Sequence, residues 1–254
     1  MKKAAATLTG LCMAYFSLSQ VRVPRTYEEL YAKLPAAKTL SEKTDTWFWL
    51  ARRYGNNFRF DSARFYLEKI KTASEPEDYM PGMGKYYLAK SRVAFLNGNF
   101  VESESNTMQA ISIFTKNPDD LYLALAHKQH AYDFMGGVAG TRDINMIRQQ
   151  FHLALKYLSK LPVNIELVFV KYELGRSFLD TYQVDSAALY LITAQKLAEK
   201  TESPGIGFNV SYMLGNLYVS LNEWDKAISY MQHALNTRPW HEMDKVMLRN
   251  CIAD

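Results

Sequence analysis

A period of about forty residues runs through most of this 254-residue chain. It is clearest in pairs of small residues that are each 40 positions apart: Gly175 and Gly215, Ala187 and Ala227, Ala194 and Ala234. Self-similarity at a fixed period is typical of stacked supersecondary units, none of which can bury its apolar face alone. The period therefore restricts the fold to a repeat architecture.

Each clear unit carries the same local pattern. A Leu-Ala or Leu-Gly pair comes first, and an acidic residue followed by a small-residue slot comes about ten positions later. The pairs are Leu50-Ala51, Leu174-Gly175 and Leu214-Gly215, and the later segments are Asp61-Ser62-Ala63, Asp185-Ser186-Ala187 and Asp225-Lys226-Ala227. A middle unit fits the series if it holds a four-residue insertion, since Ala110 and Ala154 are 44 apart.

This pattern resembles the tetratricopeptide repeat, a helix–turn–helix unit of about 34 residues. The fifth unit matches that family most fully, with Leu214, Gly215, Tyr218, Trp224, Ala227, Ala234 and Pro239. The resemblance implies an all-α fold, a right-handed superhelical solenoid of about five repeats. We place them at 44–77, 84–117, 124–161, 168–201 and 208–241. Gly175 and Gly215 are expected to lie wedged between partnered helices.

Composition agrees with a helical fold. The chain has only 12 Gly and 8 Pro, so tight turns are few, which argues against a many-stranded sandwich or barrel. Hydrophobic residues make up 48% and aromatic residues 13%, which argues against intrinsic disorder. The formal net charge of +4 gives no warrant for nucleic-acid binding.

The two ends carry their own signals. Met1-Lys2-Lys3 followed by an apolar run to Phe16 and small residues is the order of a secretory signal peptide, which we assign to 1–19. We therefore expect export to a bacterial periplasm or cell envelope. Residues 20–43 are predicted to form an N-terminal capping helix and linker. Residues 242–254 look like the start of a further repeat or a capping helix, so we expect the natural protein to continue, and any membrane contact to come from such a downstream segment.

Capping residues mark the first helices. Thr26 with Glu29 predicts a capping box for a short helix that ends before Pro35, and Thr39 with Glu42 predicts one for the next helix. The first-turn aspartates of the repeats are interpreted as structural, because a carboxylate at a helix start meets free N–H groups and the positive end of the dipole.

Motifs for catalysis or metal binding are scarce. The chain has no Gly-rich phosphate loop, His-Glu-x-x-His or nucleophile elbow, and two cysteines cannot form a disulfide framework. His127 and His130 lie three apart on an expected helix, without the further ligands that a zinc site needs. We expect no catalytic residue, no metal and no cofactor.

The surface of interest is the inner face of the solenoid, which repeat proteins use for binding. In the tetratricopeptide family the first helix of each unit lines this concave groove. The resemblance therefore implies a basic, aromatic groove made of Arg52, Lys85, Arg92, Lys128, Tyr132, Tyr172, Arg176, Tyr212 and Asn216. Guanidinium groups suit carboxylates, so the expected ligand is a protein or peptide with acidic groups. The alternative is that the arginines are solvated or paired with Glu173 and Asp180.

Several functions fit this sequence. We favour a non-catalytic repeat scaffold that binds a protein or peptide, as the exported sensory or assembly region of a signalling protein. A freestanding envelope scaffold is the first alternative. A small-molecule-binding or enzymatic helical-repeat protein, with the glycine-rich segment from Met135 to Thr141 as a gate, is a second.

Overall fold

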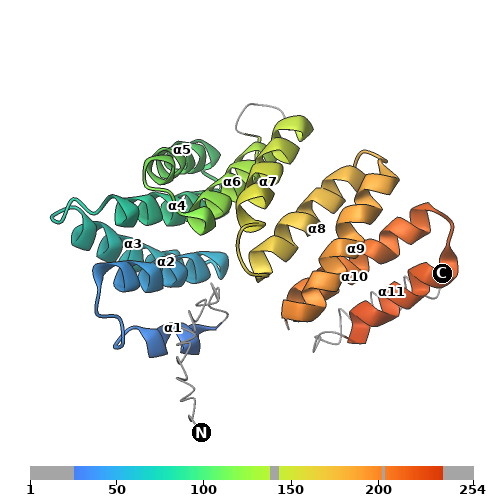
Figure 1. Cartoon of the computed structure of the whole chain (residues 1–254), viewed down its shortest axis with the longest axis horizontal. Helices are drawn as coiled ribbons and strands as arrows, with labels where there is room; N and C mark the ends of the chain where they lie inside the picture. The colour runs from blue at the N-terminus through green and yellow to red at the C-terminus, as the bar shows by residue number, and fades with distance from the viewer. Residues whose placement is uncertain (1–25, 138–142, 202–203, 237–254) are drawn as a thin grey trace, which may run out of the picture.

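The computed structural model describes residues 26–137, 143–201 and 204–236, and these residues form eleven α-helices and no strand. After α1 (Tyr27–Lys33) the helices pair into five antiparallel hairpins that follow one another along the molecule (Figure 1). The hairpins are α2 (Leu40–Asn56) with α3 (Phe60–Ser74), α4 (Met80–Leu96) with α5 (Phe100–Lys116), α6 (Asp120–Met135) with α7 (Ile144–Leu158), α8 (Ile165–Leu179) with α9 (Val184–Thr201), and α10 (Pro204–Ser220) with α11 (Trp224–Asn236). The predicted helical-repeat fold is confirmed.

Several helices begin where the sequence offers capping groups, whereas α3 and α4 have no side-chain hydrogen bond at the N-cap. Thr26 accepts a hydrogen bond from the Glu29 N–H, and Thr39 with Glu42 forms a complete capping box. Asp119 caps α6 and Asp143 caps α7 through their carboxylates. Each first helix begins three or four residues before the repeat unit that we placed from the sequence, so the last four positions of the segment 20–43 belong to α2, as the capping pair Thr39 and Glu42 predicted.

The turn inside each hairpin uses a left-handed residue. Phe58, Gly98, Gly137, Tyr182 and Asn222 all have positive φ, between 56° and 84°. Within each of two pairs, Phe58 with Gly98 and Tyr182 with Asn222, the residues are 40 apart. The forty-residue period thus fixes the turn geometry as well as the helices.

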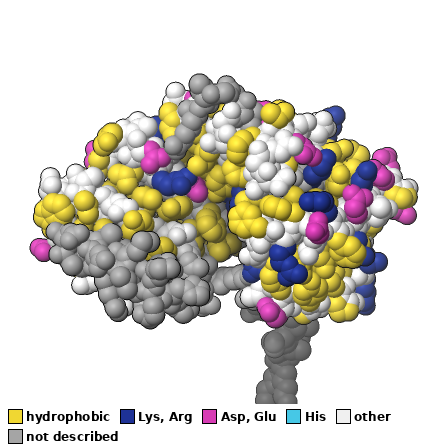
Figure 2. Space-filling view, turned by 180° about the vertical axis from the view of Figure 1, so that it is seen from behind, with side chains coloured by type: hydrophobic (Ala, Val, Ile, Leu, Met, Phe, Trp, Pro, Cys, Tyr) yellow, Lys and Arg dark blue, Asp and Glu magenta, His cyan; other side chains and the backbone are white. Residues whose placement is uncertain are grey.

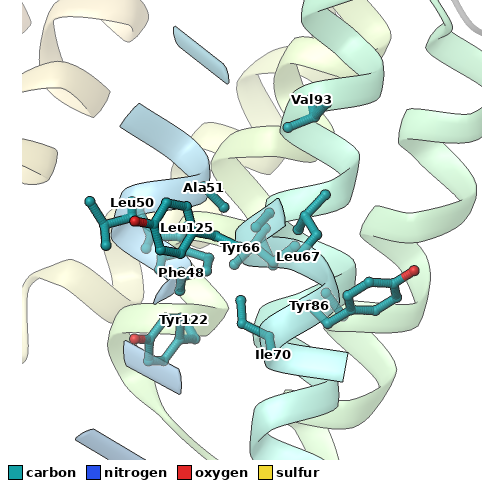
Figure 3. Packing of buried hydrophobic residues seen from close by; sticks show 14 of the residues in the cluster. Phe48, Leu50, Ala51, Tyr66, Leu67, Ile70, Tyr86, Val93, Tyr122 and Leu125 are labelled. Atoms are coloured by element: carbon teal, nitrogen blue, oxygen red, sulfur yellow. The ribbon is translucent and has the colours of Figure 1, made fainter. Parts of the chain in front are cut away.

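The core follows the same period. The small residues predicted to allow close helix approach are buried, and a Cβ on Gly175 would lie 2.6 Å from Cγ of Leu191. A Cβ on Gly215 would lie 2.7 Å from Cγ of Met231, so both glycines are wedged between the two helices of a hairpin. Figure 3 shows how the first hairpins share their apolar residues, with Phe48 of α2, Ile70 of α3 and Tyr122 of α6 close together.

Three apolar clusters cover successive hairpins. They are joined by side chains that pack against two clusters at once: Tyr157 and Leu161 between the first and second, and Phe178 and Leu197 between the second and third. The second helix of each hairpin also contacts the first helix of the next. The hairpins therefore stack on one continuous apolar spine, which brings their first helices into a row.

Some predictions fall outside the described residues. The predicted signal peptide at 1–19 and the predicted C-terminal segment at 242–254 lie there, as does 138–142 of the glycine-rich segment between α6 and α7. Among the described residues, none of the helices is both long enough and apolar enough to cross a membrane.

Candidate functional site

The first helices α2, α4, α6 and α8 carry most of the predicted groove residues. Their charged side chains meet on the inner side of the row, although three of them are not exposed as a groove wall would be. Arg52, Lys85 and Lys128 are 6%, 3% and 7% exposed. These three side chains of the predicted groove are therefore largely buried, and they do not form its exposed wall.

Arg52 is a buried cation of this cluster that packs against aromatic rings. Its guanidinium carbon lies 5.4 Å from the ring centre of Phe48 and 5.9 Å from that of Trp49. Burial lowers the pKa of the Arg52 guanidinium to about 10, against the opposing influence of the Glu166 charge. Its Nη1 atom is buried and has no hydrogen-bond partner among the described residues. The described residues therefore leave this buried donor unsatisfied.

Lys128 on α6 and Glu166 on α8 form a buried ion pair across the third and fourth hairpins. Burial lowers the pKa of the Lys128 ammonium in spite of Glu166. Burial alone would raise the pKa of Glu166, but Lys128, Arg52 and Arg92 together hold it below its ordinary value. Glu166 is therefore the anionic centre around which three cations gather.

Lys85 on α4 pairs with the preceding hairpin. Its ammonium lies 2.5 Å from Oδ1 of Asp45 on α2 and 3.3 Å from the hydroxyl of Thr44. The Tyr122 hydroxyl donates to the same Asp45 oxygen at 2.6 Å, and burial followed by the Asp45 charge raises the pKa of Tyr122 well above its ordinary value. Lys85 is thus a bound structural cation.

Arg92, Tyr132 and Arg176 extend the cluster over α4, α6 and α8. Arg92 donates to Oδ1 of Asn56 at 2.9 Å and lies 5.3 Å from the ring centre of Tyr132. The Tyr132 hydroxyl donates to Glu173 at 3.3 Å, and Arg176 lies 2.8 Å from the other Glu173 oxygen. This pairing of Arg176 with Glu173 agrees with the alternative interpretation of the sequence, in which the arginines are paired and not available to a ligand. Burial raises the pKa of Glu173, with Arg176 opposing it.

The remaining predicted residues continue the row toward the C-terminus. Tyr172 on α8 and Tyr212 on α10 are half-buried, and Tyr212 stacks on Phe208 with ring centres 5.9 Å apart. Asn216 is half-buried on α10, one turn beyond Tyr212. Tyr212 and Asn216 thus give the first helix of the fifth hairpin an aromatic, uncharged pair of predicted residues.

The acidic partners Asp45 and Glu166 were missed by the sequence analysis. A signal for them exists, since polar contacts between neighbouring hairpins join residues about one period apart. Lys85 and Asp45 are 40 apart, Lys128 and Glu166 are 38 apart, and Tyr132 and Glu173 are 41 apart. A search for polar partners at this spacing would have found all three contacts.

The histidines take local roles. His127 shares a hydrogen bond of 2.8 Å with Gln150, and its ring stacks on Tyr157. His130 lies 3.7 Å from Glu104 and packs on Phe134. Within the described ranges no group of three or more His, Cys, Asp or Glu residues could hold a metal ion.

One face of the molecule mixes both charges. Figure 2 shows one face on which Lys and Arg side chains are interspersed with Asp and Glu, among many hydrophobic ones. No extended patch of one sign gathers on the described part of that face.

Comparisons with known proteins agree with this architecture. Residues 208–239 match the model of the tetratricopeptide repeat family. Curated protein sequences give no match. Among solved structures, BtubC (BKLC) from P. vanneervenii is 17% identical with a TM-score of 0.58, over 80% of this chain and 74% of that one.

Two further solved structures are of proteins named for such repeats. A signal transduction ATPase with a tetratricopeptide repeat sensor, PH0952 from Pyrococcus horikoshii, is 16% identical with a TM-score of 0.59, over 81% of this chain and 31% of that one. Putative kinesin light chain repeats from Podosopora anserina are 14% identical with a TM-score of 0.53, over 79% of this chain and 97% of that one. At such identities the likeness is one of fold, and this fold is a tetratricopeptide-like helical repeat.

Proposed function

We propose that this tetratricopeptide-like repeat protein is a non-catalytic scaffold that binds a protein or peptide through acidic groups. The single observation that carries the proposal is the Nη1 atom of Arg52, which is buried without a hydrogen-bond partner among the described residues. An unsatisfied buried donor costs about 1–3 kcal/mol. A ligand carboxylate that reached Arg52 would remove this cost on binding.

The balance of charge supports an acidic ligand. Five cations, Arg52, Lys85, Arg92, Lys128 and Arg176, face three carboxylates, Asp45, Glu166 and Glu173. The surplus is positive, and Arg92 and Arg176 are only half-buried, so both remain reachable from solvent. Bidentate hydrogen bonds from guanidinium groups recognise carboxylates with both energy and geometry.

The test compares two peptides that differ only in charge, one with glutamates and one with glutamines at the same positions. The Arg92→Gln/Arg176→Gln variant is expected to bind the glutamate peptide at least about tenfold more weakly than the natural chain. The control Arg64→Gln/Lys196→Gln removes the same charge from exposed positions of α3 and α9 and is expected to leave binding unchanged. Equal binding of both peptides, or equal loss in the control, would contradict the proposal.

Arg52 itself is tested by Arg52→Met, which keeps a long apolar stem against Phe48. Circular dichroism establishes whether this variant folds. A folded Arg52→Met chain with undiminished affinity for the glutamate peptide would show that Arg52 is not the receptor group.

We further propose that the chain is the exported sensory region of a signalling protein, with a freestanding envelope scaffold as the alternative. The support is the order of residues 1–19 and, by analogy, the tetratricopeptide repeat sensor for which PH0952 is named. Fractionation of native cells with sequencing of the mature N-terminus tests export. A mature chain starting near residue 20 in the envelope supports it, and an intact Met1 in the cytoplasm contradicts it.

A further inference from the structure

A cavity of about 610 Å³ lies on the inner side of the N-terminal hairpin, next to the charge cluster. Its walls come from α1, the first half of α2, the start of α6 and Leu161. Leu30, Trp49, Leu121 and Leu161 supply apolar surface, and the volume falls within the range of about 300–1,000 Å³ that is usual for ligand pockets. The cavity can therefore bury a side chain together with part of its backbone.

Its charge is opposite to that of the cations Arg52, Lys85, Arg92, Lys128 and Arg176, which we call the arginine cluster. Four carboxylates line it, those of Glu42, Asp45, Asp119 and Asp120, with the ammonium of Lys33, and two of these acids also pair with lysines outside the lining, Asp45 with Lys85 and Asp120 with Lys160. The pKa of Glu42 is lowered, first by the backbone N–H of Thr39 and then by that of Lys38, so this carboxylate is ionised at neutral pH. The cavity thus joins an apolar wall to an anionic rim.

The three aspartates keep acceptor capacity. Every polar contact of Asp45, Asp119 and Asp120 within the described part of the chain falls on Oδ1. Asp45 receives Lys85 and Tyr122 there, Asp119 receives two backbone N–H groups at the start of α6, and Asp120 receives Lys160 at 2.7 Å. The second oxygen of each carboxylate has no donor from the described chain, so each can still accept a hydrogen bond from a bound cation.

We propose that this cavity binds a lysine or arginine side chain of a protein partner. A compact metal ion does not fit, because no three acidic or histidine side chains in the described residues come together closely enough to hold one. A long cation fits better, since its methylene stem can lie on Trp49 and the leucines while its charged head reaches the rim. Charge complementarity therefore selects a basic residue over an acidic or neutral one.

This proposal deepens the proposed function and rests on it, because the cavity lies next to the arginine cluster. Asp45 forms the ion pair with Lys85, so the cavity and the arginine cluster meet at this pair. Asp45 and Arg52 are seven residues apart on α2, which is about 10 Å along a helix. A peptide in this row would then carry a basic residue about three positions from an acidic one, at about 3.3 Å of extended chain per residue.

The experiment uses two short capped peptides, Ala-Ala-Lys-Ala-Ala and the same sequence with Gln for Lys, titrated onto the isotope-labelled full chain. Binding is followed by the indole N–H resonance of Trp49, assigned with Trp49→Phe. The lysine peptide is expected to shift this resonance to saturation, and the glutamine peptide is expected to leave it unchanged. Equal shifts from the two peptides would overturn the proposal.

A variant with three fewer negative charges tests whether the carboxylates of the rim bind the lysine side chain. Glu42→Gln, Asp119→Asn and Asp120→Asn together remove three charges but keep the capping acceptors, because Gln and Asn serve in these helix-start positions. We expect at least about tenfold weaker binding of the lysine peptide. The control Asp61→Asn, Asp185→Asn and Asp225→Asn removes the same charge from the first turns of α3, α9 and α11 and is expected to change affinity by less than about twofold. Similar losses in both variants, or none in the first, would overturn the proposal.

The glutamate peptide from the previous experiment is titrated in parallel. If it binds while the lysine peptide does not, the cavity proposal fails and the proposed function stands. If the lysine peptide alone binds, the cavity proposal holds and the arginine cluster is not the receptor.

Discussion

Lys128 on α6 and Glu166 on α8 form an ion pair with both side chains only 8% exposed, and it joins the third hairpin to the fourth. The two members of the pair have unequal surroundings. Arg52 and Arg92 also stabilise the Glu166 carboxylate, whereas the same two arginines repel the Lys128 ammonium. Removing the charge of Glu166 therefore leaves three cations together without an anion. Removing the charge of Lys128 leaves Glu166 with two arginines.

This asymmetry predicts unequal losses of stability. Glu166→Gln is expected to lower the free energy of unfolding by about 3–5 kcal/mol, as for a buried charge left without its partner. Lys128→Met is expected to lower it by about 1–2 kcal/mol, because the arginines still balance Glu166. Urea denaturation followed by circular dichroism measures both. An equal loss in the two variants would mean that the arginines do not reach Glu166 in solution.

A second prediction concerns the glycine that holds the fourth hairpin together. Gly175→Ala places a methyl group 2.6 Å from Cγ of Leu191, a fully buried side chain, and 3.3 Å from the backbone oxygen of Ala187. Overpacking of this kind costs about 1–3 kcal/mol. We expect a lower urea midpoint for Gly175→Ala.

Gly207 on α10 provides the matched control. A Cβ there meets nothing within 4 Å among the described residues, so Gly207→Ala is expected to raise stability by about 0.5–1 kcal/mol, the usual gain of Ala over Gly inside a helix. If both substitutions changed the stability in the same direction, close helix approach would not be the reason why a glycine occupies position 175.

The glycines at equivalent positions of the fourth and fifth hairpins, Gly175 and Gly215, show what the sequence could predict. The period, Gly175 and Gly215 predicted the helical hairpins, because close packing of two helices needs a small residue at a fixed place in each unit. The same pattern could not predict that Arg52, Lys85 and Lys128 are buried. Burial of a long side chain depends on how closely neighbouring first helices approach, and that distance is set by all the side chains between them.

The acids of the cluster were harder to foresee for a further reason. Glu166 lies in the first turn of α8, where a carboxylate already has a sufficient local explanation in the helix dipole. Its contact with Lys128 becomes visible only when residues one period apart are compared. Local rules and the repeat period thus give different interpretations of the same residue, and the structure shows that both apply.

The third prediction concerns pH. Asp133 on α6 is fully buried, where its carboxylate accepts hydrogen bonds from Ser103, Thr107 and Gln129. Burial raises its pKa above the ordinary value of 3.8, although these three donors and then the nearby His130 oppose the shift. The folded chain therefore holds the Asp133 proton more tightly than the unfolded chain.

The direction of the pH dependence of stability follows from that difference in proton affinity. Between 3.8 and the raised pKa the folded state binds more protons, so the contribution of Asp133 to stability falls as pH rises through this interval. Asp133→Asn removes this contribution. We expect the stability of the natural chain relative to Asp133→Asn to decrease from about pH 4 toward neutrality in urea denaturation at a series of pH values. A difference that is constant with pH would show that Asp133 titrates normally.

The last prediction uses the turn inside the fourth hairpin. Tyr182 has a φ of 56° and is 89% exposed, so its side chain gains little from packing while its backbone adopts a conformation that costs about 1 kcal/mol for most L-residues. Asn222 has a φ of 57° at the equivalent turn of the next hairpin, and Asn tolerates this region through its short polar side chain. Tyr182→Asn is therefore expected to raise the melting temperature by about 2–4 °C. The reverse exchange, Asn222→Tyr, is expected to lower it by a similar amount, since both turns have the same geometry. A loss of stability in Tyr182→Asn would mean that the exposed tyrosine has a stabilising contact in solution that offsets its backbone strain.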